Sequence, residues 1–143
     1  MLRTLALVAT LLAVLAGCGD PDQKMLTEGA RAARDAASAV GTARLAAQSA
    51  LDHKLWNAPA TQMVSDAEKS IGKVATTFDA LQPKTGHSRA TYDSYSKALS
   101  TAQDEITDLR IALTNNDLGT VADQVTQLQT LGQQLHRLGE QAK

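Results

Sequence analysis

The three histidines of this 143-residue chain are the side chains best suited to metal binding or acid–base chemistry, and they are scattered. His53, His87 and His136 fall in different segments, and only His136 has a carboxylate at helical spacing, that of Glu140. An i, i+4 pair of this kind is usually a contact on a helix surface. Because protein zinc sites use three or four convergent ligands, we expect no metal site and no cofactor.

Acidic residues are the second source of possible chemistry. They concentrate in the segments "SDAEK" and "AQDEITD" and comprise Asp66, Glu68, Asp104, Glu105 and Asp108. Most of them fall away from the apolar positions, which indicates a solvated polar face rather than a pair of catalytic carboxylates. The chain contains no G-x-S-x-G, S-x-x-K or C-x-x-C-H motif and no glycine-rich phosphate loop. We therefore expect a protein that is not an enzyme.

The single cysteine, Cys18, follows an apolar run near the start of the chain. One basic residue, Arg3, precedes the run, which covers residues 5–16. A short basic start, an apolar segment and a small-residue boundary are typical of a secretory signal. The run is shorter than the about 20 apolar residues of a membrane-spanning helix. The pattern predicts a signal peptide at residues 1–17 that is removed from the mature protein.

The residues at this boundary, Leu15-Ala16-Gly17-Cys18, resemble the lipobox of bacterial lipoproteins. The resemblance implies cleavage before Cys18, a diacylglycerol on its thiol and usually acylation of the new amino terminus. Two or more acyl chains anchor a protein stably, whereas one binds only marginally. We expect a lipid-anchored protein on the extracytoplasmic face of the cell membrane, with residues 18–24 as lipidated cysteine and tether. The alternative is a plain signal peptide whose boundary contains a cysteine.

Composition disfavours nucleic acid as a partner. The formal net charge is -1, and only four residues are aromatic: Trp56, Phe78, Tyr92 and Tyr95. Nucleic-acid binding requires a basic patch, and stacking on bases requires aromatic platforms.

The rest of the chain has the periodicity of helices. Apolar residues recur three and four positions apart over 64–81, 92–113 and 118–138. A first helix, over about 22–56, has mostly alanine at its core positions. No alternating strand pattern occurs. Because the connections between these helices are short, we predict an all-α, antiparallel up-down-up-down four-helix bundle over residues 25–143.

Lipidation and this topology together predict an orientation. The start of the first helix, the connection near Pro83 and the end of the last helix would lie near the membrane. The other two connections would form a distal tip, available to an extracytoplasmic partner, with Trp56, Asn57, Asn115, Asn116 and Asp117. Trp56 has a second interpretation, as a plug that closes the end of the bundle. The membrane-proximal end mixes charges with a slight basic bias, which suits either anionic headgroups or plain solvation. Its basic residues and histidine are Lys24, Lys84, His87, Arg89, Arg137 and Lys143, and its acids are Asp20, Asp22, Glu28 and Glu140.

These patterns support two functional hypotheses. The first is a non-enzymatic lipoprotein that acts through protein contacts as an envelope or accessory factor, with an unknown envelope protein as its partner. The segments "DAEKSIGKVATTFDALQP" and "DLRIALTNNDL" are similar to segments of small uncharacterised helical lipoproteins of actinobacteria, a resemblance that implies no known activity. The alternative is a tethered small-ligand-binding module, with a pocket at Ala33, Ala37 and Gly41 opposite Gly72.

Overall fold

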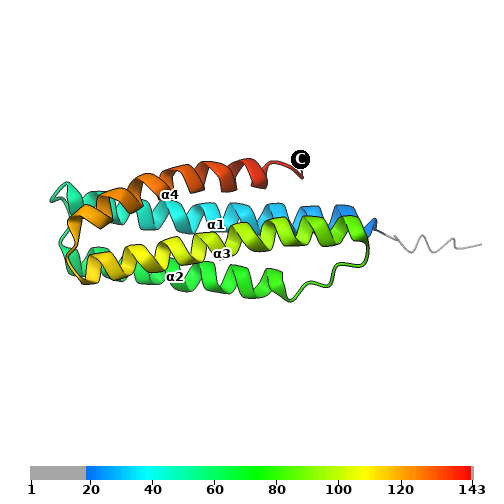
Figure 1. Cartoon of the computed structure of the whole chain (residues 1–143), viewed down its shortest axis with the longest axis horizontal. Coiled ribbons are helices and arrows are strands. Elements are labelled where there is room, and N and C mark those ends of the chain that lie inside the picture. The colour runs from blue at the N-terminus through cyan, green and yellow to red at the C-terminus, as the bar shows by residue number, and fades with distance from the viewer. Residues whose placement is uncertain (1–18, 143) are drawn as a thin grey trace, which may run out of the picture.

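The computed structural model describes residues 19–142, so the predicted signal peptide and Cys18 lie outside the described residues. Within this range the chain forms four helices and no strand, which confirms the predicted all-α class. The helices are α1 (Pro21–Leu51), α2 (Asn57–Asp79), α3 (Gly86–Thr114) and α4 (Leu118–Gly139). They lie side by side in an elongated bundle (Figure 1). None of the four is both long enough and apolar enough to cross a membrane.

Local chemistry sets the limits of the helices. Asp20 accepts a hydrogen bond from the backbone N–H of Asp22 at the start of α1, with Pro21 in the first turn. α1 begins inside the segment that we predicted as a tether. It ends at Leu51 rather than near Trp56, because His53 has a left-handed backbone (φ 56°) that cannot continue a helix.

α1 is the central helix of the bundle. It packs against α2, α3 and α4, whereas α2 and α4 have no mutual contact in the described part of the chain. Its buried residues cover a wide face: Met25, Gly29, Ala30, Ala32, Ala33, Ala36, Ala39, Val40, Ala43, Ala46 and Ala47. Small side chains let a helix approach three neighbours at once, so the composition of α1 follows from its position.

The other helices supply the bulk of the core. Their buried large apolar residues are Val64, Ile71, Phe78, Tyr95, Leu99, Ile106, Leu109, Leu113, Val121, Val125, Leu128, Leu131 and Leu135. These positions lie on the stripes that the sequence predicted. Leu118 is the exception, because it is exposed at the first position of α4.

Tyr95 joins three helices at one level of the core. A Cβ built on Gly29 of α1 would lie 2.5 Å from Cδ2 of the Tyr95 ring, so the ring occupies the space that any larger residue would need. The Tyr95 hydroxyl donates to the carbonyl of Leu138, at 3.0 Å. The ring also lies against Phe78 of α2, with centroids 6.0 Å apart. Tyr95, a residue of α3, therefore fixes the spacing of α3 from α1, α2 and α4.

Hydrogen bonds show which helix ends lie together. The Thr85 hydroxyl donates to the Asp22 carboxylate, which joins the start of α3 to the start of α1. Asn57 Nδ2 donates to the carbonyl of Leu113, at 2.8 Å, which joins the start of α2 to the end of α3. We call the end with the start of α1 and the α2–α3 connection the base. The end with the α1–α2 and α3–α4 connections is the tip (Figure 1).

Candidate functional site

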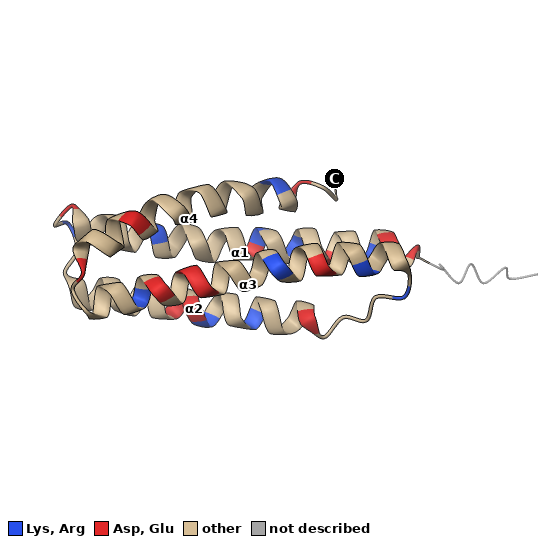
Figure 2. Ribbon diagram, viewed as in Figure 1, with Lys and Arg blue, Asp and Glu red and all other residues tan. Residues whose placement is uncertain are grey.

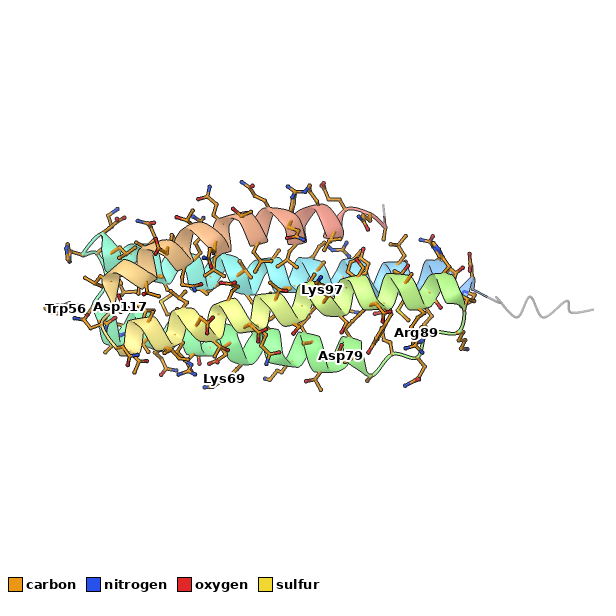
Figure 3. All side chains as sticks on the ribbon, in the orientation of Figure 1. Trp56, Lys69, Asp79, Arg89, Lys97 and Asp117 are labelled. Carbon is orange, nitrogen blue, oxygen red and sulfur yellow. The ribbon has the colours of Figure 1, made fainter. Side chains whose placement is uncertain are left out.

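The tip carries the residues that the sequence singled out for partner contact. Figure 3 shows Trp56 and Asp117 at the same end of the molecule, far from Arg89. The two connections border a hollow of about 360 Å³. Its lining residues are Ala50, His53, Lys54, Leu55, Trp56, Asn57, Asn116 and Leu118.

Trp56 does not plug the bundle. Its side chain is 86% exposed, so the interpretation as a plug is wrong. Leu113 and Ala60, both fully buried, already fill the core near this end. Trp56 instead takes the N-cap position of α2 with an extended backbone (φ -67°, ψ 154°). The largest apolar side chain of the protein therefore faces solvent.

The predicted polar residues of the tip divide into two groups. Asn57 and Asn116 line the hollow. Asn57 also has its Oδ1 atom buried without a hydrogen-bond partner among the described residues. Asn115 and Asp117 act on the backbone instead: Asn115 caps the end of α3, and Asp117 caps the start of α4. Both residues are also exposed to solvent.

Asp117, the N-cap residue of α4, accepts hydrogen bonds that define its protonation state. Its carboxylate accepts from the Thr120 hydroxyl at 2.7 Å and from the Thr120 N–H at 3.1 Å. The side-chain hydrogen bond from Thr120, followed by the backbone bonds from Thr120 and Gly119, lowers the pKa of Asp117. The cap is therefore ionised at neutral pH.

Two residues of the hollow have an unusual backbone. His53 (φ 56°) and Asn116 (φ 54°) are the two non-glycine residues with positive φ within residues 19–142. Left-handed backbone costs about 1–2 kcal/mol for residues other than glycine, less for asparagine, and such positions cluster at binding sites. Both lie in the hollow, one from each connection. In the sequence, His53 stands out only as a possible metal ligand, and nothing in its spacing indicates this turn.

Exposed apolar side chains gather around the tip. Within the described range, the large apolar residues with high exposure are Leu45 (61%), Trp56 (86%), Met63 (40%), Ile111 (45%) and Leu118 (42%). All five lie in the connections or within about two helical turns of them. We call these five residues the tip patch. Leu45, Met63 and Ile111 were not among the residues that we predicted at the tip. Each lies off the apolar stripe of its helix and near a helix end, and this position is the sequence signal that indicates an exposed apolar residue.

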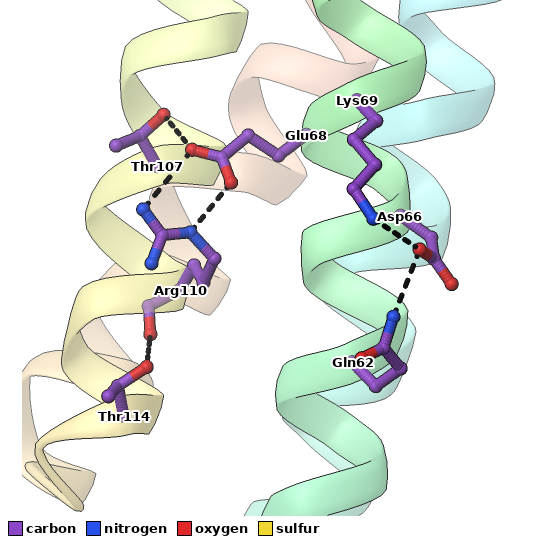
Figure 4. Close-up of polar contacts among 7 residues, drawn as sticks. All are labelled: Gln62, Asp66, Glu68, Lys69, Thr107, Arg110 and Thr114. Atoms are coloured by element: carbon purple, nitrogen blue, oxygen red, sulfur yellow. Dashed lines mark hydrogen bonds and ion pairs between the residues drawn. The ribbon is translucent and has the colours of Figure 1, made fainter.

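A second polar cluster lies between α2 and α3, in the half of the bundle nearer the tip (Figure 4). The Arg110 Nε donates to Glu68 Oε2 at 2.6 Å, and the Thr107 hydroxyl donates to Glu68 Oε1 at 2.7 Å. Burial alone would raise the pKa of Glu68, but the hydrogen bonds from Arg110 and Thr107 and the nearby positive charges lower it on balance. The expectation of a solvated acid is thus wrong for Glu68, which ties two helices together.

Glu105 also departs from a solvated face. It is half-buried on α3, and its Oε2 atom is buried without a hydrogen-bond partner among the described residues. Burial, with added repulsion from Asp108 and Asp104, raises the pKa of Glu105. Elsewhere acidic and basic residues are interspersed along the helices (Figure 2).

The small-ligand pocket does not form as expected. Ala33 is fully buried in the core. Gly72 faces Gln103 of α3 rather than α1. Ala37 and Gly41 instead line a hollow of about 560 Å³ along α4, beside Gly132.

Histidines and carboxylates form no metal-binding group of three within residues 19–142. His136 and Glu140 make the predicted surface contact, with Nε2 and Oε1 3.7 Å apart. Searches against protein families, curated proteins and solved structures found no match to the chain.

Proposed function

We propose that this protein is a non-enzymatic, membrane-anchored lipoprotein on the extracytoplasmic face, acting through protein contacts as an envelope or accessory factor. In this proposal the signal peptide is removed, Cys18 carries the lipid and the four helices alternate up, down, up and down. The lipobox sequence supports the anchor. The hydrogen bonds that join the starts of α1 and α3, and the start of α2 to the end of α3, support the alternating topology.

The observation that carries the proposal is the placement of the tip patch. Exposed apolar residues gather at the end of the bundle opposite Gly19, the residue that follows Cys18. The 31 residues of α1 span about 46 Å at 1.5 Å per residue, so the patch would stand well clear of the lipid. Clustered exposed apolar residues mark interaction sites, and tryptophan is enriched among the residues that dominate binding energy.

Photo-crosslinking in the native membrane tests this assignment. We would place benzoylphenylalanine at Trp56 in one variant and at Arg89, an exposed residue of the basal half (Figure 3), in a matched control. We expect discrete protein adducts from Trp56 and none from Arg89. Adducts of equal yield from both positions would contradict a tip-specific contact.

A further inference from the structure

A groove lies at the base, between the first turns of α1 and the α2–α3 connection. Its volume is about 750 Å³, about twice that of the hollow at the tip. Its lining residues are Gly19, Pro21, Lys24, Met25, Glu28, Leu81, Gln82 and Lys84. Those of α1 recur three and four positions apart, so they form one face of the helix.

The groove combines apolar residues with free cations. Met25 is buried and Leu81 is half-buried, and both belong to the apolar packing of the bundle. Lys24 and Lys84 are exposed, and within residues 19–142 neither ammonium makes an ion pair or hydrogen bond. Among the charged lining residues, two lysines accompany one carboxylate, that of Glu28, and the acids Asp20 and Asp22 belong to the same stretch of chain.

The two nearby acids are hydrogen-bonded at the helix starts. Asp22 accepts one hydrogen bond from the Thr85 hydroxyl, which holds its carboxylate at the junction of α1 and α3, and Asp20 accepts from the backbone N–H of Asp22. Lys84, the basic residue of the α2–α3 connection, lines the groove together with Gly19 and Lys24, and basic residues are marked along the helices in Figure 2. Apolar surface next to unpaired ammonium groups suits a ligand with an anionic head and an apolar body, because lysine binds phosphate as a compact point charge.

We propose that this groove binds the phosphate headgroup of an anionic phospholipid in the membrane that anchors the protein. The inference rests on the proposed lipidation of Cys18. Gly19 lines the groove and follows Cys18 directly, so no residue separates the anchor from the groove lining. Tethering at this distance converts headgroup binding into an intramolecular event. A headgroup bound in the groove would hold the long axis of the bundle away from the membrane surface and present the tip patch away from the lipid.

Lysine reactivity on vesicles tests the proposal. The purified lipidated protein is added to preformed vesicles of phosphatidylcholine, alone or mixed equally with phosphatidylglycerol, and a water-soluble amine reagent is applied. We expect Lys24 and Lys84 to react about fivefold more slowly on the anionic vesicles, the factor that corresponds to one basic residue near a charged surface. Lys54 and Lys69, exposed elsewhere on the bundle, serve as internal controls and should react equally on both.

Two double variants distinguish binding in the groove from a general effect of surface charge. Lys24→Gln/Lys84→Gln should abolish the lipid-dependent protection of the backbone amides of residues 81, 82, 84 and 85 in hydrogen exchange, whereas Lys54→Gln/Lys69→Gln should leave it unchanged. An acylated, membrane-held protein with equal lysine reactivity on both vesicles would overturn the groove site and leave the anchor standing. A protein without acyl mass that stays off the vesicles would overturn both. Protection by inorganic phosphate in the absence of anionic lipid would assign a free-anion site and overturn the membrane proposal.

Discussion

Two glycines of α1 should respond in opposite ways to substitution by alanine. Gly41 lies mid-helix, and a Cβ there would meet open space among the described residues. Alanine is about 0.8–1 kcal/mol more favourable than glycine in a helix interior. We therefore expect Gly41→Ala to stabilise the protein by about that amount, or to raise Tm by about 3–5 °C in a domain of this size.

Gly29 has the same helix propensity but a different surrounding. A Cβ there would lie 2.5–2.7 Å from three atoms of the Tyr95 ring, about 1 Å inside normal contact. The ring cannot move freely, because its hydroxyl is bonded to Leu138 and its face lies near Phe78. Overpacking costs about 1–3 kcal/mol, and loss of the hydrogen bond adds about 1 kcal/mol. After subtraction of the propensity gain, Gly29→Ala should destabilise by about 1–3 kcal/mol.

Urea unfolding monitored by circular dichroism measures both changes. A double-mutant cycle gives the sharper test: in a Tyr95→Ala background the ring is absent, so Gly29→Ala should become stabilising and match Gly41→Ala. Equal effects of the two substitutions in the wild-type background would refute the close contact between α1 and Tyr95.

Three further predictions follow from the polar contacts and the tip. Glu68→Gln should destabilise the protein by about 1–2 kcal/mol at neutral pH. Because the folded-state pKa of Glu68 is lowered, its contribution to stability is present above the unfolded-state pKa and disappears as the pH falls through the folded-state pKa. Urea titrations of the wild type and the variant should therefore converge in acid. Glu105→Gln should stabilise the protein by about 0.5 kcal/mol at neutral pH. The pKa of Glu105 is raised in the folded state, so the ionised carboxylate is unfavourable there above the folded-state pKa. Equal stability of variant and wild type at neutral pH would contradict the burial of the Glu105 carboxylate. Trp56→Ala should leave the free energy of unfolding within about 0.5 kcal/mol of wild type, because the side chain is exposed. The same variant should lose the protein adducts that a crosslinker at Leu118 captures. A loss of stability would show a structural role for Trp56 instead.

The sequence predicted α2, α3 and α4 well because their cores use large apolar residues. Residues such as Ile71, Leu109 and Leu128 cannot be left in water without cost, so their spacing reports the buried face. Alanine carries little such information, because it suits an exposed helix as well as a buried one. The single predicted stripe on α1 therefore omitted Ala32, Ala36, Ala39 and Ala46, which are buried because α1 contacts three helices.

The tip was predicted in outline and not in detail. Short connections indicated which loops would lie together, and both loops do border one hollow. The exposure of Trp56 depends on whether other residues already fill the end of the core, and sequence spacing does not report that. The left-handed backbone of His53 and the isolated Glu105 carboxylate likewise depend on tertiary packing.

Membrane anchoring through Cys18 is the central claim, and the intact mass of the mature protein tests it most directly. We would express the chain and a Cys18→Ala variant in a bacterium with a lipoprotein-processing pathway, separate membrane from soluble fractions and measure intact mass. The account predicts a membrane-bound species that begins at Cys18 and carries the added mass of diacylglycerol, and loss of both acyl mass and membrane retention in Cys18→Ala. A wild-type species without acyl mass, or equal membrane retention of the variant, would contradict it.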